Sequence, residues 1–138
     1  MFTMKARSTA ALLATAAALV PLGATIGATG AVASAPAQTK LSIHTQNGDF
    51  SGSIKSKKRK CMNNREVHVF RQLGTQRHPS TDEEVASDTS SIQNGVGRWE
   101  TGNTGLRDGK RYYAYTPAIG GCKAGISGTV TTVLDPEF

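Results

Sequence analysis

The chemistry of the two cysteines is the easiest to infer from the sequence. Cys61 and Cys122 are the only cysteines present. In an exported protein an even number of cysteines favours a disulfide. A metal site would need further ligands at a useful spacing, which the scattered histidines do not provide, and the C-x-x-C pattern of a redox site is absent. We therefore expect a Cys61–Cys122 disulfide, which would stabilise the fold by about 4 kcal/mol by constraining the unfolded chain.

The densest charge in the chain lies in residues 55–60. Five of these six residues are cations: Lys55, Lys57, Lys58, Arg59 and Lys60. Outside a cell such a cluster can bind anionic cell-wall polymers or phospholipid head groups, and salt would weaken that binding by screening. The alternative is a solvated turn whose charges repel one another and prevent edge pairing. The cluster is therefore a candidate anion-binding site.

The tyrosines of residues 110–116 are candidates for an aromatic contact. Because side chains alternate across a strand, Tyr112 and Ala114 should face one side, and Arg111, Tyr113 and Tyr115 the other. If Tyr112 belongs to the core, Tyr113 and Tyr115 are exposed and could contact a carbohydrate or a protein. The alternative is that these rings pack against neighbouring strands.

Charge is segregated along the sequence. Residues 40–78 carry nine cations against two acids, whereas residues 79–100 carry one cation against five acids. Four of these acids could bind Ca²⁺, but they lack the glycine and the ligand periodicity of an EF-hand. We expect a solvated loop there and no metal site. The four acids are Asp82, Glu83, Glu84 and Asp88.

No motif of a known catalytic type occurs in the chain. The histidines His44, His68 and His78 are isolated from one another. The sequence contains no G-x-S-x-G elbow, no H-E-x-x-H pair and no phosphate-binding glycine loop. We therefore expect no enzymatic activity, no catalytic residues and no cofactor.

The first 33 residues have the order of a secretory signal peptide. A basic start is followed by an apolar run at residues 10–20 and then by small residues. Patterns of the A-x-A type place the cleavage after Ala33, Ala35 or Ala37, and we favour the first. A bilayer span needs about 20 strongly apolar residues, and this run is about half that length. We therefore expect secretion without a stable membrane anchor.

Residues 41–134 have the pattern of an all-β domain. Short apolar or alternating runs are separated by turn residues, and Asn-Gly pairs at 47–48 and 94–95 predict tight hairpins. Such a pattern in a chain of this length predicts two packed antiparallel sheets. Residues 34–40 would form a short linker and residues 135–138 a C-terminal tail. Seven strands are expected, at residues 41–46, 49–56, 66–73, 84–89, 96–101, 110–116 and 124–134.

Several motifs resemble those of small exported proteins of high-GC Gram-positive bacteria. Their domains are similar to prealbumin-like sandwiches, the fold of transthyretin and of carboxypeptidase regulatory domains. The resemblance implies a seven-stranded antiparallel Greek-key β-sandwich of prealbumin-like or Ig-like type, and it carries over no catalytic residue. The charged insertion at residues 75–84 departs from the pattern. The motifs are the Lys-rich turn before Cys61, Arg65-Glu-Val67-His-Val69, Asp88-Thr89, Gly97-Arg98-Trp99, Gly109-Lys-Arg-Tyr112-Tyr113-Ala114 and Cys122.

Together these features predict a secreted, non-enzymatic β-sandwich protein that acts as a cell-surface or extracellular binding or accessory module. The expected partner is an anionic cell-wall polymer or a secreted protein, and no nucleic-acid partner is expected. The alternative is a small secreted enzyme inhibitor or hydrolase-associated protein. An inhibitor needs a rigid exposed loop, and residues 72–84 are the only candidate.

Overall fold

The structure is a computed structural model that describes residues 34–134. The predicted signal peptide and C-terminal tail lie outside the described residues. Within residues 34–134 the chain forms ten β-strands and one short 3-10 helix, η1 (Arg59–Cys61). Every pair of neighbouring strands is antiparallel, so the expected all-β class with two antiparallel sheets is confirmed.

The first sheet has the strand order β1-β3-β7-β6, and β2 pairs with the same strand, β3, as β1 does. The Asn47–Gly48 turn joins β2 to β3, and both of its residues have positive φ, as the sequence predicts. The strands are β1 (Lys40–Leu41), β2 (His44–Gln46), β3 (Asp49–Lys55), β6 (Ser91–Gln93) and β7 (Val96–Asn103).

The second sheet has the strand order β10-β8-β4-β5, and β9 pairs with β8. Its two central strands, β4 and β8, are rich in β-branched and aromatic residues, which suit a pleated surface. The strands are β4 (Glu66–Arg71), β5 (Glu83–Thr89), β8 (Arg111–Thr116), β9 (Gly125–Ile126) and β10 (Val130–Thr131).

The hydrophobic core lies between the two sheets and draws residues from both. Phe50 and Trp99 of the first sheet are buried together with Val69 and Tyr112 of the second. The rings of Phe50 and Tyr112 are 5.0 Å apart between centroids, so the inner faces of the sheets meet directly. This arrangement is sandwich-like, and Trp99 is a core residue.

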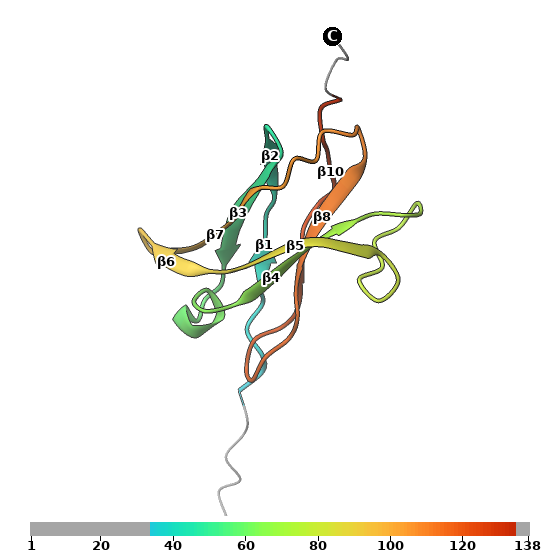
Figure 1. The fold of residues 1–138 in the computed structure, drawn as a ribbon. Helices are drawn as coiled ribbons and strands as arrows, with labels where there is room; N and C mark the ends of the chain where they lie inside the picture. The colour runs from blue at the N-terminus through green and yellow to red at the C-terminus, as the bar shows by residue number, and fades with distance from the viewer. Residues whose placement is uncertain (1–33, 135–138) are drawn as a thin grey trace, which may run out of the picture. The chain divides into compact units, whose positions relative to one another are not determined.

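The chain passes between the two sheets at three places, and the passage from β5 to β6 is the shortest. β5 belongs to the second sheet, and the chain continues through Ser90 into β6 of the first sheet (Figure 1). Ser90 is buried, and its hydroxyl donates to the carbonyl of Met62 (2.8 Å) and accepts from the amide of Arg65 (3.0 Å). These bonds satisfy the polar groups at the point where the strand changes sheet.

The observed strands differ from the seven expected ones at three places. The first predicted strand is divided into β1 and β2 at residues 42–43. There the carbonyl oxygen of Ser42 lies close against Gly52 of the neighbouring strand. The last is divided at residues 127–129, where the Ser127 hydroxyl, rather than a carbonyl, accepts from the amide of Ala114 (2.7 Å). The strand β6 was not expected, because its residues Ser91–Gln93 are mostly polar.

Candidate anion-binding site

The predicted cationic cluster lies where β3 ends and continues into η1, next to the segment that contains Cys122. The register of β1 adds Lys40 to it, and the disulfide adds Lys123; sequence reasoning did not include either residue. None of these cations forms an ion pair with any residue of the described range 34–134. We call this set the basic end. Its members are Lys40, Lys55, Lys57, Lys58, Arg59, Lys60 and Lys123.

Two lysines of the basic end face each other directly across a strand pair. Lys40 of β1 is the register partner of Lys55 of β3, and the next pair, Leu41 and Ile54, is buried in the core. Because side chains alternate along a strand, Lys40 and Lys55 point away from the core on the outer face of the first sheet. Like charges directly opposite one another destabilise a sheet. The fold therefore retains a local electrostatic cost at this position.

A groove of about 540 Å³ runs along the basic end. One wall is the segment Ala35–Gln38 and the other is the turn after β3. The first wall is held by main-chain hydrogen bonds, from the amide of Ala37 to the carbonyl of Gly121 and from the amide of Lys123 to the carbonyl of Ala37 (both 2.9 Å). The lysines that line the groove are Lys40, Lys55, Lys57 and Lys58.

The predicted disulfide is confirmed and lies at the basic end. Cys61 and Cys122 are bonded, their Cα atoms are 5.5 Å apart, and both residues are buried. Cys61 directly follows Lys60, and Cys122 directly follows Gly121. The bond therefore fixes the end of the basic turn against the segment that carries Gly121.

A buried arginine underlies the basic end, and sequence reasoning did not assign it a role. The guanidinium of Arg65 donates to the carbonyls of Cys61 (3.1 Å), Pro117 (2.8 Å) and Lys123 (3.2 Å) and to the hydroxyl of Thr39 (3.2 Å). Burial lowers the pKa of Arg65 from its usual value, but an arginine stays charged in proteins. Arg65 thus connects, through its hydrogen bonds, the segments that contain its four partners, and it adds a buried positive charge near the basic end.

Of the two tyrosines predicted to form an exposed aromatic contact, only Tyr115 is partly exposed to solvent. Tyr112 is in the core, and Tyr113 faces outward as expected, but Tyr113 is fully buried, so its expected exposure is wrong. Its ring stacks on Phe70 (5.7 Å between centroids), and its hydroxyl donates to Asp82 (2.6 Å). The cause is the charged insertion, which folds over the outer face of the second sheet. Tyr115 remains half-buried.

The insertion that covers this face is anchored by one carboxylate. Asp82 accepts hydrogen bonds from the amides of Leu73 (3.0 Å) and His78 (2.7 Å) as well as from Tyr113. Burial alone would raise the pKa of Asp82, but these three bonds lower it below its usual value. Burial, together with the bond to Asp82, raises the pKa of Tyr113, so its hydroxyl stays protonated as the donor. The segment between β4 and β5 is thus a loop with a defined shape.

Glu83 and Glu84 pair within the second sheet, whereas Asp88 accepts a hydrogen bond from the amide of Glu100 in the first sheet (2.7 Å). Glu84 lies 2.6 Å from Nδ1 of His68, and Glu83 lies 2.9 Å from the guanidinium of Arg71. Neither acid reaches the basic end in an ion pair. Among the described residues no group of three His, Cys, Asp or Glu side chains could hold a metal ion.

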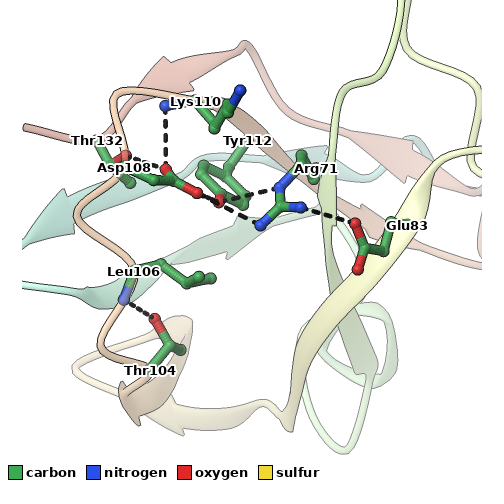
Figure 2. A network of polar contacts seen from close by, with 8 residues as sticks. All are labelled: Arg71, Glu83, Thr104, Leu106, Asp108, Lys110, Tyr112 and Thr132. Carbon is green, nitrogen blue, oxygen red and sulfur yellow. Dashed lines mark hydrogen bonds and ion pairs between the residues drawn. The ribbon is translucent and has the colours of Figure 1, made fainter. Parts of the chain in front are cut away.

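A second polar cluster lies away from the basic end (Figure 2). The Tyr112 hydroxyl donates to Asp108 (2.7 Å), Arg71 reaches both Asp108 (3.3 Å) and the Tyr112 oxygen (3.3 Å), and Thr132 donates to Asp108 (2.8 Å). The amide of Lys110 completes the set of donors to Asp108 (3.0 Å). The groups of this cluster satisfy one another, and we assign it a structural role: it connects β4, β8 and the last described residues.

His44 lies in a row with a serine and an acid, but not in the order of a catalytic triad. His44, Ser51 and Glu100 form one row across β2, β3 and β7, on the rim of a depression of about 460 Å³. In this row the serine stands between the histidine and the acid. A Ser–His–acid relay instead needs the histidine between the other two.

Among the described residues no helix is both long and apolar enough to cross a membrane.

No protein-family model matches the chain, and no curated protein matches it. The prealbumin-like resemblance therefore stays a prediction from the sequence motifs.

Proposed function

We propose that this protein is a secreted, non-enzymatic accessory module that binds an anionic polymer of the cell envelope through its basic end. The observation that carries the proposal is the set of cations at one end of the two sheets that form no ion pair within residues 34–134. An anionic polymer would supply the missing counter-charge along the groove. Such binding depends on the summed field of several charges rather than on one contact.

The cost of bringing these charges together supports a binding role over a merely solvated turn. A solvated turn only needs its charges to face water. Here Lys40 and Lys55 are register partners, a placement that destabilises the sheet unless an anion lies nearby. Bound polymer would reverse the sign of that interaction.

The extracellular location belongs to the proposal. It is supported by the order of the first 33 residues in the sequence and by the buried disulfide, because disulfides persist in oxidising compartments. The prealbumin-like Greek-key arrangement of the strands is likewise proposed, on the strength of the sequence motifs.

Co-sedimentation with purified cell walls tests the proposal. The protein should bind walls that retain their anionic polymers, and binding should fall steeply as salt rises to about 0.15 M, where charges are screened beyond about 8 Å. The triple variant Lys57→Gln, Lys58→Gln, Lys60→Gln should lose binding while its thermal stability stays nearly unchanged, because exposed charges contribute little to folding.

A matched control removes three cations at the opposite end of the sheets. The triple variant Arg107→Gln, Lys110→Gln, Arg111→Gln lowers the net charge by the same amount as the first variant does. This control should keep most of the binding, because the basic end is intact in it. Salt-insensitive binding, or equal loss in both triple variants, would contradict a role for the basic end.

Enzyme inhibition through residues 72–84 is the second candidate, favoured by the way this loop is held. Besides the bonds to Asp82, Arg111 donates to the carbonyl of Gly74 (2.8 Å), while Leu73 at the start of the loop is 61% exposed. A rigid, exposed loop loses little entropy when it binds a protease cleft. Inhibition of secreted serine proteases that is lost in Leu73→Ala would support this role. The absence of inhibition by the wild-type protein would reject it.

A further inference from the structure

We propose that Lys58 and Lys60 form a discrete phosphate site above Gly121, and that the neighbouring groove holds the next phosphate of the same phosphodiester chain. This inference rests on the proposed function and specifies its ligand. Three features support it: the geometry above Gly121, the elements that fix that geometry, and the type of cation present.

Two ammonium groups converge over a single glycine. A Cβ atom at Gly121 would lie 2.8 Å from Nζ of Lys60 and 4.0 Å from Nζ of Lys58, so both ammonium groups lie beside this glycine and Lys60 packs directly on it. The Lys58 ammonium donates to the hydroxyl of Ser34 (3.3 Å), a neutral partner. Neither ammonium has a carboxylate within ion-pair distance among residues 34–134.

Two cations this close repel each other. An oxyanion between them would replace the repulsion with charge-assisted hydrogen bonds, which are about twice as strong as neutral ones. A side chain at Gly121 would displace the Lys60 ammonium from its position. The positive φ of this residue, +78°, also favours glycine at the position.

The disulfide holds the two sides of this site in place. Lys60 precedes Cys61 and Gly121 precedes Cys122, so the bond joins the residues directly after the lysine and the glycine. The turn of η1 fixes the main chain of Lys60 on one side. A site held in this way is formed before the ligand arrives, which reduces the entropy lost on binding.

The site above Gly121 is continuous with the groove. Lys58 borders both, and the groove adds Lys40, Lys55 and Lys57. A polymer with repeating negative charges can therefore place one anion between Lys58 and Lys60 and another in the groove. A single small anion would use only part of this surface.

The type of cation is compatible with a phosphodiester chain. All the cations that line the groove and the Gly121 site are lysines. Lysine binds phosphate as a compact point charge on a flexible stem, without the fixed two-bond geometry of the arginine fork, so several lysines can follow successive phosphates. Arg59, the arginine of the basic turn, lines neither the groove nor the space above Gly121.

This difference between neighbouring residues gives the decisive experiment. Affinity for a synthetic poly(glycerol phosphate) oligomer is measured by calorimetry in low salt, for the wild-type protein and for the single variants Lys60→Gln and Arg59→Gln. Both variants lose one charge from the same turn. Lys60→Gln should weaken binding about tenfold, the effect of losing one charge-assisted contact, whereas Arg59→Gln should weaken it about twofold or less. Thermal unfolding of each variant checks that the fold is retained.

The outcomes separate this inference from the proposed function. Equal weakening by the two variants would overturn the discrete phosphate site and leave general polyanion binding intact. Equally tight binding of a polygalacturonate, a carboxylate polymer, would overturn the preference for phosphate. Failure of the wild-type protein to bind any of these polyanions in low salt would overturn both the site and the proposed function.

Discussion

At the residue scale, two aspartates hold irregular segments against the second sheet. Asp82 anchors the loop between β4 and β5, and Asp108 anchors the segment before β8. For Asp108, burial alone would raise the pKa, but hydrogen bonds from Tyr112, from the amide of Lys110 and from Thr132 lower it below its usual value. Both carboxylates therefore stabilise the fold in their charged form.

These lowered pKa values predict a loss of stability in acid. A carboxyl group whose pKa is lower in the folded state contributes stability above its unfolded pKa, about 3.9 for Asp, and loses that contribution as pH falls through the folded value. The free energy of unfolding, measured with urea at a series of pH values, should therefore decrease below about pH 4.

The variant Asp108→Asn tests the contribution of the Asp108 carboxylate separately from that of Asp82. It should lower the free energy of unfolding at neutral pH by about 1–3 kcal/mol, because it weakens hydrogen bonds to a charged acceptor. It should also flatten the acid dependence. An unchanged acid dependence would mean that Asp108 contributes nothing to it.

Individual residues differ in how far the sequence predicts them. The disulfide follows from counting cysteines, and the cationic cluster is contiguous in sequence. The packing of Tyr113 on the neighbouring strand agrees with the alternative that strand pairing offered, but the hydrogen bond from its hydroxyl to Asp82 depends on a loop from another part of the chain and was not predicted. Arg65 was missed for a similar reason, since its hydrogen-bond partners come from segments distant in sequence.

At the element scale, β3 needs a glycine in its middle. A Cβ at Gly52 would lie 1.9 Å from the carbonyl oxygen of Ser42 and 2.8 Å from the Trp99 ring. The variant Gly52→Ala must move main-chain atoms, so we expect it to lower the free energy of unfolding by about 1–3 kcal/mol. Denaturant unfolding measures the loss.

Gly128 is the control for this prediction. A Cβ there would have no neighbour within 4 Å, and its φ is not positive. Gly128→Ala should change stability by less than about 0.5 kcal/mol, as surface substitutions usually do. Equal effects at the two positions would show that the close approach of Ser42 is unimportant.

Alternation of side chains was a reliable guide to the central strands. β3, β4, β7 and β8 lie where the pattern placed them, although their ends differ by one or more residues. The pattern did not indicate where a strand changes sheet. At Ser90 the side-chain and main-chain hydrogen bonds, rather than hydrophobicity, determine the path, and such bonds leave no periodic signal in the sequence.

At the scale of the described domain, the disulfide spans more than half of residues 34–134. It joins residues 61 positions apart, so in the unfolded state it closes a loop that includes both central strands of the second sheet. Reduction should lower the free energy of unfolding by about 4 kcal/mol, on the chain-entropy argument. Urea unfolding with and without a reductant measures this difference. A shift of less than about 1 kcal/mol would indicate that the unfolded chain gains little freedom on reduction.

The position of Ala37 links the proposed signal-peptide cleavage to the shape of the groove at the basic end. Its amide and carbonyl both bond to the segment around Cys122, and Ala35–Gln38 forms one wall of the groove. The proposed cut after Ala33 would leave this wall in place, whereas a cut after Ala37 would remove Ala35, Pro36 and Ala37 from it. All the cations of the basic end lie after Ala37 and would stay in both forms. The position of the proposed cut therefore determines whether the groove keeps its first wall.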